Sequence, residues 1–177
     1  MRIEWNDYYK DKLIEAAKEM ALTARTAPKA RGRDQLHILI LTDDDKDALS
    51  DQMNRIGEEE NIEFFIRDAK NLRSAPVILL LGTEVSPLEI PHCGFCGFAD
   101  CQENRENDSV PCAFSIGDLG IAVGSAAAYA ARNHIDNRIM FSAGKASLEL
   151  GCFPGPVKVA FGIPLSATGK NPFFDRK

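Results

Sequence analysis

The chain has 177 residues, of which 45% are apolar, and its 21 basic and 26 acidic side chains give a formal net charge of −5. This length and apolar content suffice for one hydrophobic core, so we expect a single domain over residues 1–177. The charge balance lacks the basic excess that binding to a phosphate backbone usually requires. Nucleic acid is therefore not an expected partner.

The expected cellular compartment of the protein determines how its cysteines are interpreted. No run approaches the roughly 18 uninterrupted apolar residues of a membrane span, and the opening residues MRIEWNDYYK lack the apolar core of a signal peptide. We therefore expect a cytoplasmic protein with no membrane partner. Because the cytosol keeps thiols reduced, the five cysteines favour metal or redox uses over a disulfide framework.

The first half of the chain shows alternating helical and strand patterns. Apolar residues at three- and four-residue intervals indicate an amphipathic helix, and a run that is apolar on both faces indicates a central strand of a covered sheet. In chain order the patterns predict a helix over 6–26, a strand over 36–41, a helix over 43–56 that Gly57 ends, and strands over 62–66 and 76–81.

The second half begins with a segment over 82–111 that shows neither helical nor strand periodicity. Long irregular loops in compact domains are usually functional. After it we expect helices over 115–133 and 137–150, a strand over 157–162 and a polar, extended tail from residue 164. Asp136 or Asn137 is expected to cap the second of these helices. Gly120 and Gly124 in the first helix favour tight packing within the chain, with a dimer interface as the alternative.

Four of the five cysteines lie in the irregular segment. Cys93, Cys96 and Cys101 fall within nine residues, and Cys112 follows after a gap of ten. Four thiolates are the usual ligand set of an iron–sulfur cluster. Glycines after the first two cysteines allow the backbone to curl and to direct amides at the cluster. We therefore predict an iron–sulfur loop over residues 83–114.

Other interpretations of these cysteines stay open. Zinc is one alternative, although three bunched ligands and one distant ligand differ from the usual two close pairs. A loop that binds no metal is another. His92 is expected to be a surface residue, and Cys152 to be a plain thiol without a role in the site.

Several strings in this region and beyond it resemble a family of uncharacterised prokaryotic proteins that contain a ferredoxin domain. They are CGFCGFADC, PCAFSIGDLGIAVGSA, DNRIMFSAGKAS and GIPLSATGKNPFFDRK. The spacing of the first three cysteines also resembles the four-cysteine [4Fe–4S] module of corrinoid iron–sulfur proteins. This resemblance implies a [4Fe–4S] cluster, although the fourth cysteine comes sooner here than in that module.

A second resemblance concerns the fold. The segment ALTARTAPKARGRDQLHILILTD, with the later APVILLLG and VKVAFGIPL, is similar to nitroreductase-family flavoproteins. It implies an α+β fold, a nitroreductase-like layered sheet flanked by helices, here with a Cys-rich loop insertion. In that family FMN lies at a homodimer interface. The resemblance implies flavin contacts from Arg25, Lys29, Arg31 and Arg33, although the family's arginine-serine motif has no counterpart here and a solvated loop is the alternative.

Together these expectations describe an iron–sulfur redox protein that transfers electrons or carries out flavin-dependent reduction of a small substrate. It is expected to be a homodimer that works with a redox partner protein or a small molecule, and it is a possible FMN-dependent oxidoreductase of nitroreductase type. One alternative is a zinc-stabilised, non-catalytic binding or scaffold protein. Another is a flavin enzyme in which the cysteines are incidental.

Overall fold

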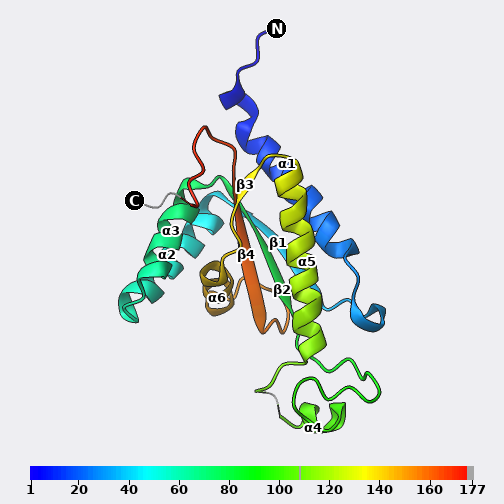
Figure 1. Cartoon of the computed structure of the whole chain (residues 1–177). Coiled ribbons are helices and arrows are strands. Elements are labelled where there is room, and N and C mark those ends of the chain that lie inside the picture. The colour runs from blue at the N-terminus through cyan, green and yellow to red at the C-terminus, as the bar shows by residue number, and fades with distance from the viewer. Residues whose placement is uncertain (108, 175–177) are drawn as a thin grey trace.

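The computed structural model describes residues 1–107 and 109–174, and an antiparallel sheet forms its centre (Figure 1). The strand order is β1-β2-β4-β3. The strands are β1 (Leu36–Thr42), β2 (Val77–Thr83), β3 (Asp136–Asn137) and β4 (Val159–Ser166). All seven residues of β2 are buried, so this strand is the middle of the structure.

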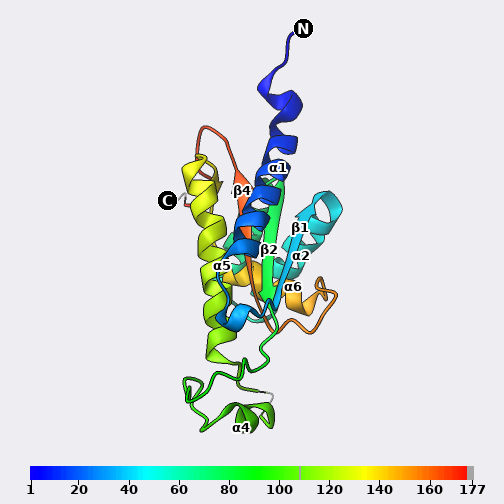
Figure 2. The same ribbon diagram turned by 90° about the vertical axis from the view of Figure 1, so that its right-hand side faces the viewer.

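Helices cover both faces of the sheet (Figures 1 and 2). On one face lie α1 (Trp5–Thr26) and α5 (Ala113–Arg132), and on the other lie α2 (Asp43–Glu59), α3 (Glu63–Ser74) and α6 (Phe141–Glu149). Alternate residues of β2 serve the two cores, since Leu79 belongs to the first and Leu80 to the second. The predicted layered arrangement of helices around a sheet is confirmed.

Helix α6 lies very close to β4. A Cβ atom placed on Gly144 would lie 1.9 Å from the carbonyl oxygen of Ala160. Only glycine allows this approach, because no other residue lacks the Cβ. Gly57 has a similar role, since its Cβ would lie 2.6 Å from the side chain of Ile66. The prediction that Gly57 ends a helix is wrong: it allows α2 and α3 to pack together.

The predicted strand over 62–66 is also wrong, because Glu63–Ser74 is helix α3. Its buried residues Phe65, Ala69 and Leu72 follow helical spacing. A short apolar run does not distinguish a strand from a helix, and here the burial pattern that continues to Leu72 decides for the helix.

The region after α5 also differs from the prediction. Asp136 and Asn137 do not cap a helix but form β3, which pairs with β4 at Ser166 and Leu165, and the helix begins only at Phe141. Strand β4 continues past the predicted end at residue 162 and includes Pro164. The proline is tolerated because β3 pairs with β4 only at Ser166 and Leu165. In the predicted polar tail Phe173 is buried, and residues 175–177 of that tail lie outside the described residues.

Helix α5 is dense in small residues. Nothing lies within 4 Å of a Cβ placed on Gly117, Gly120 or Gly124, so the predicted tight packing at Gly120 and Gly124 within the chain is wrong. Ile121 beside them is 47% exposed. Among residues 1–107 and 109–174, α5 is the one helix whose length and composition would allow it to cross a membrane, and 33% of that window is buried in the protein.

The segment between β2 and α5 projects beyond the end of the sheet, at the opposite end of the molecule from the N-terminus (Figures 1 and 2). It carries the short helix α4 (Cys101–Arg105) and most of the cysteines.

Candidate metal centre

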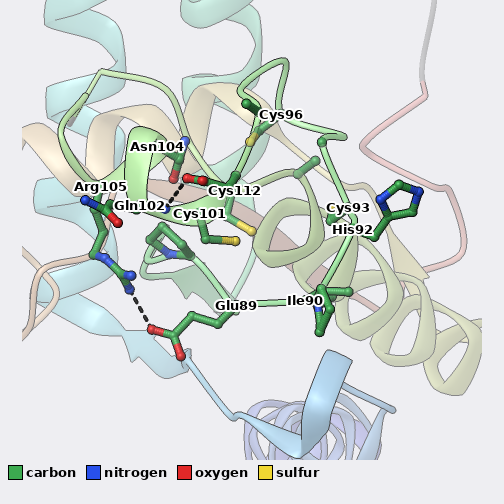
Figure 3. A pocket seen from close by; sticks show the side chains of 16 residues that line it. Glu89, Ile90, His92, Cys93, Cys96, Cys101, Gln102, Asn104, Arg105 and Cys112 are labelled. Carbon is green, nitrogen blue, oxygen red and sulfur yellow. Dashed lines mark hydrogen bonds and ion pairs between the residues drawn. The ribbon is translucent and has the colours of Figure 1, made fainter.

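Four cysteines from separate parts of the projecting segment line one cavity. Cys93 and Cys96 lie on the turn that precedes α4, Cys101 is the first residue of α4, and Cys112 is the N-cap of α5. All four line a cavity of about 460 Å³, around which Figure 3 shows them arranged. All are free thiols. The structure therefore brings together the four residues that the sequence singled out.

The turn that carries the first two cysteines depends on glycine. Gly94 has a φ of 64° and Gly97 a φ of 91°, both in the left-handed region that glycine adopts without strain. The amide of Gly97 donates a hydrogen bond to the carbonyl of Gly94 at 3.0 Å and closes the turn. The backbone thus curls at the two positions where the sequence predicted it. His92 is exposed, as expected.

Cys101 is placed by a capped helix start. The Asp100 carboxylate accepts hydrogen bonds from the amides of Gln102 and Glu103, both at 2.9 Å. The Glu103 carboxylate in turn accepts one from the amide of Ala99 at 2.8 Å. An acidic N-cap followed three residues later by Glu is a known sequence signature of a helix start, and it would have revealed α4.

Cys112 has the surroundings of a thiolate. Burial raises the pKa of its thiol, but the amides of Ser115, Leu88 and Phe114 donate hydrogen bonds to the sulfur and bring the pKa below the ordinary value of 9.0. Cysteines at helix N-termini commonly ionise more easily for this reason. Because the thiolate is the form that binds metal, Cys112 has the surroundings that a metal ligand needs.

The cysteines do not form a preorganised single-ion site. Among residues 1–107 and 109–174, no group of three or more His, Cys, Asp or Glu side chains has the geometry to hold one metal ion. A tetrahedral zinc with bonds of about 2.3 Å draws its four sulfurs to within roughly 4 Å of one another. In a [4Fe–4S] cluster each cysteine binds a different iron, which spreads the four thiolate sulfurs apart. Four thiols around a wide cavity fit the cluster better.

The base of the cysteine segment is tied to the body of the protein by hydrogen bonds and one ring contact. The amide of Cys112 donates to the carbonyl of Val85 at 3.2 Å, and the Ser115 hydroxyl donates to the carbonyl of Ser86 at 3.1 Å. The ring of Phe95 stacks on that of Phe114 with centroids 5.5 Å apart. These contacts fix the two ends of the segment relative to α5.

The four basic residues assigned to a flavin lie in and before the loop around the short turn η1 (Ala30–Gly32). Arg25 donates to the Asp34 carboxylate at 2.5 Å and to the carbonyl of Leu36 at 2.9 Å. Lys29 donates to three carbonyls at the end of α1, which belong to Ala24, Arg25 and Ala27. Both side chains therefore hold the loop to its own helix.

Arg31 and Arg33 reach the cysteine segment instead. Arg31, at a φ of 56°, donates to the carbonyls of Leu88 at 3.0 Å and Glu89 at 2.8 Å. Arg33 pairs with the Glu89 carboxylate at 3.5 Å. From the other side, the Asp118 carboxylate of α5 accepts the amide of Ala30 at 3.0 Å. No sequence signal identified Glu89 or Asp118 as contacts of this loop.

These contacts bear on the flavin expectation. Each of the four cations has partners within the chain, and the hollow beside Lys29 and Arg33 measures only about 10 Å³. The residues of a single chain, as arranged here, do not fit a flavin phosphate. Their assignment to FMN stays a prediction, and no step below depends on it.

Two comparisons of sequence bear on identity. A family model described as an uncharacterized protein containing a ferredoxin domain matches residues 108–176, which include Cys112 but not the other three cavity cysteines. An uncharacterized protein of Archaeoglobus fulgidus is 37% identical over 183 residues, covering 99% of this chain and 98% of the relative. The second likeness therefore extends over the whole cysteine segment.

Comparison with solved structures identifies the fold. The FMN-dependent nitroreductase NfnB from Mycobacterium smegmatis matches with a TM-score of 0.58 at 14% identity, covering 88% of this chain and 78% of that one. A nitroreductase with bound FMN from Desulfitobacterium hafniense matches with a TM-score of 0.59 at 14% identity and the same coverage. At this identity the likeness shows the fold alone, and the predicted nitroreductase-like fold is confirmed.

Proposed function

This chain belongs to the family of uncharacterized proteins containing a ferredoxin domain, and from that premise we propose that it is a redox protein with one iron–sulfur cluster. Cys93, Cys96, Cys101 and Cys112 are the proposed ligands, and [4Fe–4S] is the proposed type because the spacing of the first three cysteines resembles that of a four-cysteine [4Fe–4S] module. The observation that carries the proposal is the single cavity that all four thiols line. The family and the fold both suggest redox function.

When bound, the cluster supplies one-electron transfer, and the protein sets its surroundings. Ile90, Pro87 and Pro91 line the cavity and reduce the access of water to it. Phe95 does not line the cavity and is 75% exposed. The helix amides at Cys112 stabilise negative charge on the sulfur.

The proposed assembly is a homodimer in the cytoplasm that exchanges electrons with a partner protein or a small molecule. The support for a dimer is the uncovered strip of α5 that contains Gly117, Gly120, Ile121 and Gly124. Small residues allow two such helices to approach closely, and a two-fold axis would place identical strips face to face.

The direct test is metal analysis of protein purified without oxygen. Iron, zinc and acid-labile sulfide are measured together with the visible spectrum for the wild type, Cys96→Ala and Cys152→Ala. We expect iron, sulfide and broad visible absorbance in the wild type, their loss in Cys96→Ala, and their retention in Cys152→Ala. A colourless protein with stoichiometric zinc would replace the redox proposal by the zinc-stabilised scaffold.

A further inference from the structure

A second cavity of about 420 Å³ adjoins the cysteine cavity. The two share the wall formed by Pro87, Glu89, Asn104 and Arg105. The second cavity is also lined by Arg33 from the loop around η1, Glu84 after β2 and Lys158 before β4. Residues from distant parts of the chain therefore meet in the second cavity, and the shared wall separates them from the thiols.

Among the described residues that line this second cavity, positive charge exceeds negative charge. Its three cations are Arg33, Arg105 and Lys158, and its carboxylates are Glu84 and Glu89. The Glu84 carboxylate lies 3.0 Å from Nε2 of His37, a residue that does not line the cavity. Glu89 alone is shared between Arg105 at 2.6 Å and Arg33 at 3.5 Å. One carboxylate thus faces two guanidinium groups.

Lys158 adds a cation that has no counter-ion among the residues that the structure describes. Its ammonium group forms no ion pair or hydrogen bond with residues 1–107 or 109–174, and the residue is exposed. Its backbone is nevertheless fixed, because its amide donates to the carbonyl of Thr83 at 3.1 Å. The ammonium therefore lies at the cavity on an anchored backbone.

The arginines are held in place before any ligand arrives. Arg31 donates to the carbonyls of Leu88 and Glu89 and so ties the Arg33 loop to the wall. The pKa of Glu89 lies below its ordinary value of 4.5, first because of the hydrogen bond from Arg105 and then because of the nearby charges of Arg105, Arg33 and Arg31. Glu89 stays ionised at neutral pH and cannot neutralise both of its partners.

We propose that this second cavity binds an oxyanion, a phosphate or carboxylate group carried by a small molecule, through Arg33, Arg105 and Lys158. Guanidinium forks and an ammonium group are the donors that bind these groups with charge-assisted hydrogen bonds. The proposal of anion binding depends only on the residues of this cavity. That the bound molecule exchanges electrons across the shared wall rests on the proposed cluster.

The test is isothermal titration calorimetry of the full chain, purified without oxygen, with inorganic phosphate in one arm and acetate in the other at constant ionic strength. We expect saturable binding in at least one arm. Arg105→Gln and Lys158→Gln should each weaken it about tenfold, the loss of one charge-assisted hydrogen bond. Lys12→Gln removes the same charge from an exposed position of α1, far from the cavity, and should leave the affinity unchanged.

The arms distinguish the ligand chemistry. Binding of phosphate alone identifies a phosphate-bearing ligand, and binding of acetate alone identifies a carboxylate. No saturable binding in either arm, or equal weakening by Lys12→Gln, would overturn the proposal. Iron analysis of Lys158→Gln separates the anion site from the cluster, because Lys158 does not line the cysteine cavity and this variant should keep its iron while anion binding weakens. A protein that contains iron but binds neither anion would contradict the anion site and leave the proposed cluster intact.

Discussion

The sheet and the cysteine segment are stabilised in different ways. Every residue of β2 is buried between two layers of helices, and α6 approaches β4 so closely that Gly144 has no room for a Cβ. The segment between β2 and α5 instead projects from the body, and hydrogen bonds at its base hold it. The burial of apolar surface specifies the sheet without help. The projecting segment buries little, so we expect the proposed cluster to have the larger part in ordering it.

The largest effect should come from filling the contact between α6 and β4. Gly144→Ala places a methyl group against the backbone of Ala160, which cannot move without distorting β4. Overpacking typically costs 1–3 kcal/mol, and we expect about 3 kcal/mol here because backbone is involved. Tm should then fall by roughly 6–12 °C in thermal unfolding.

Gly117→Ala is the matched control, since it also replaces a helical glycine but meets nothing within 4 Å. In protein dilute enough to be monomeric, where the proposed dimer strip of α5 is free, it should raise the stability by about 0.5–1 kcal/mol, because alanine is the better helix former. Equal loss of stability in both variants would contradict the close approach of α6 to β4.

Loss of the cluster should affect only the projecting segment. In Cys101→Ser we expect faster amide hydrogen exchange over residues 88–105, while β2 and β4 keep the protection of the wild type. The reason is that ligation orders the segment and apolar burial orders the sheet. Cys152→Ser should change neither region, because Cys152 does not line the cavity. Collapse of protection throughout the sheet would show that the two regions are not separable.

A smaller effect is expected at the base of the segment. Arg31→Gln removes the guanidinium that donates to the carbonyls of Leu88 and Glu89. Because Arg31 is exposed, we expect about 1 kcal/mol or less of stability to be lost. Iron should be released several-fold faster to a chelator, which absorbance decay would follow. Arg132→Gln, at the exposed end of α5, is the control and should release iron at the rate of the wild type.

The smallest effect concerns two thiols in the metal-free protein. The pKa of Cys112 lies below 9.0, because amide hydrogen bonds outweigh the effect of burial, whereas burial and then the nearby Asp45 carboxylate raise the pKa of Cys152 above 9.0. As pH rises, alkylation by iodoacetamide should therefore accelerate first at Cys112 and later at Cys152. Mass spectrometry of the two peptides measures this order, and the reverse order would contradict the assigned surroundings.

The same lowered pKa has a consequence for stability. The thiolate of Cys112 is favoured in the folded chain, so its contribution is fully present above the pKa of the unfolded thiol. It is lost as pH falls through the lower pKa of the folded form. The contribution applies to the metal-free protein.

The sequence predicted the strongly periodic elements well, because their cores follow one repeat over many residues. The helix expected over 6–26 is observed as Trp5–Thr26, and the strand expected over 36–41 as Leu36–Thr42. The error over 62–66 came from a window too short to show whether the repeat was two or nearly four residues. Gly57 was misread because its role depends on a neighbouring helix, which composition does not reveal.

Part of the candidate site could also be predicted from local sequence, and part could not. The four cysteines could be identified because their spacing is local and four thiolates have few other uses. The contacts of Arg31 and Arg33 with residues 88 and 89 are separated by more than fifty positions, and no local pattern pairs them. The second cavity depends on four such distant segments and was therefore invisible in the sequence.

Electron paramagnetic resonance of the anaerobic protein tests whether the four cysteines hold a redox-active iron–sulfur cluster. After reduction with dithionite we predict a rhombic or axial signal of a reduced cluster that integrates to about one spin per chain and is absent from Cys112→Ala. A wild-type protein that shows no such signal before or after reduction, and that contains zinc in place of iron, would contradict the account.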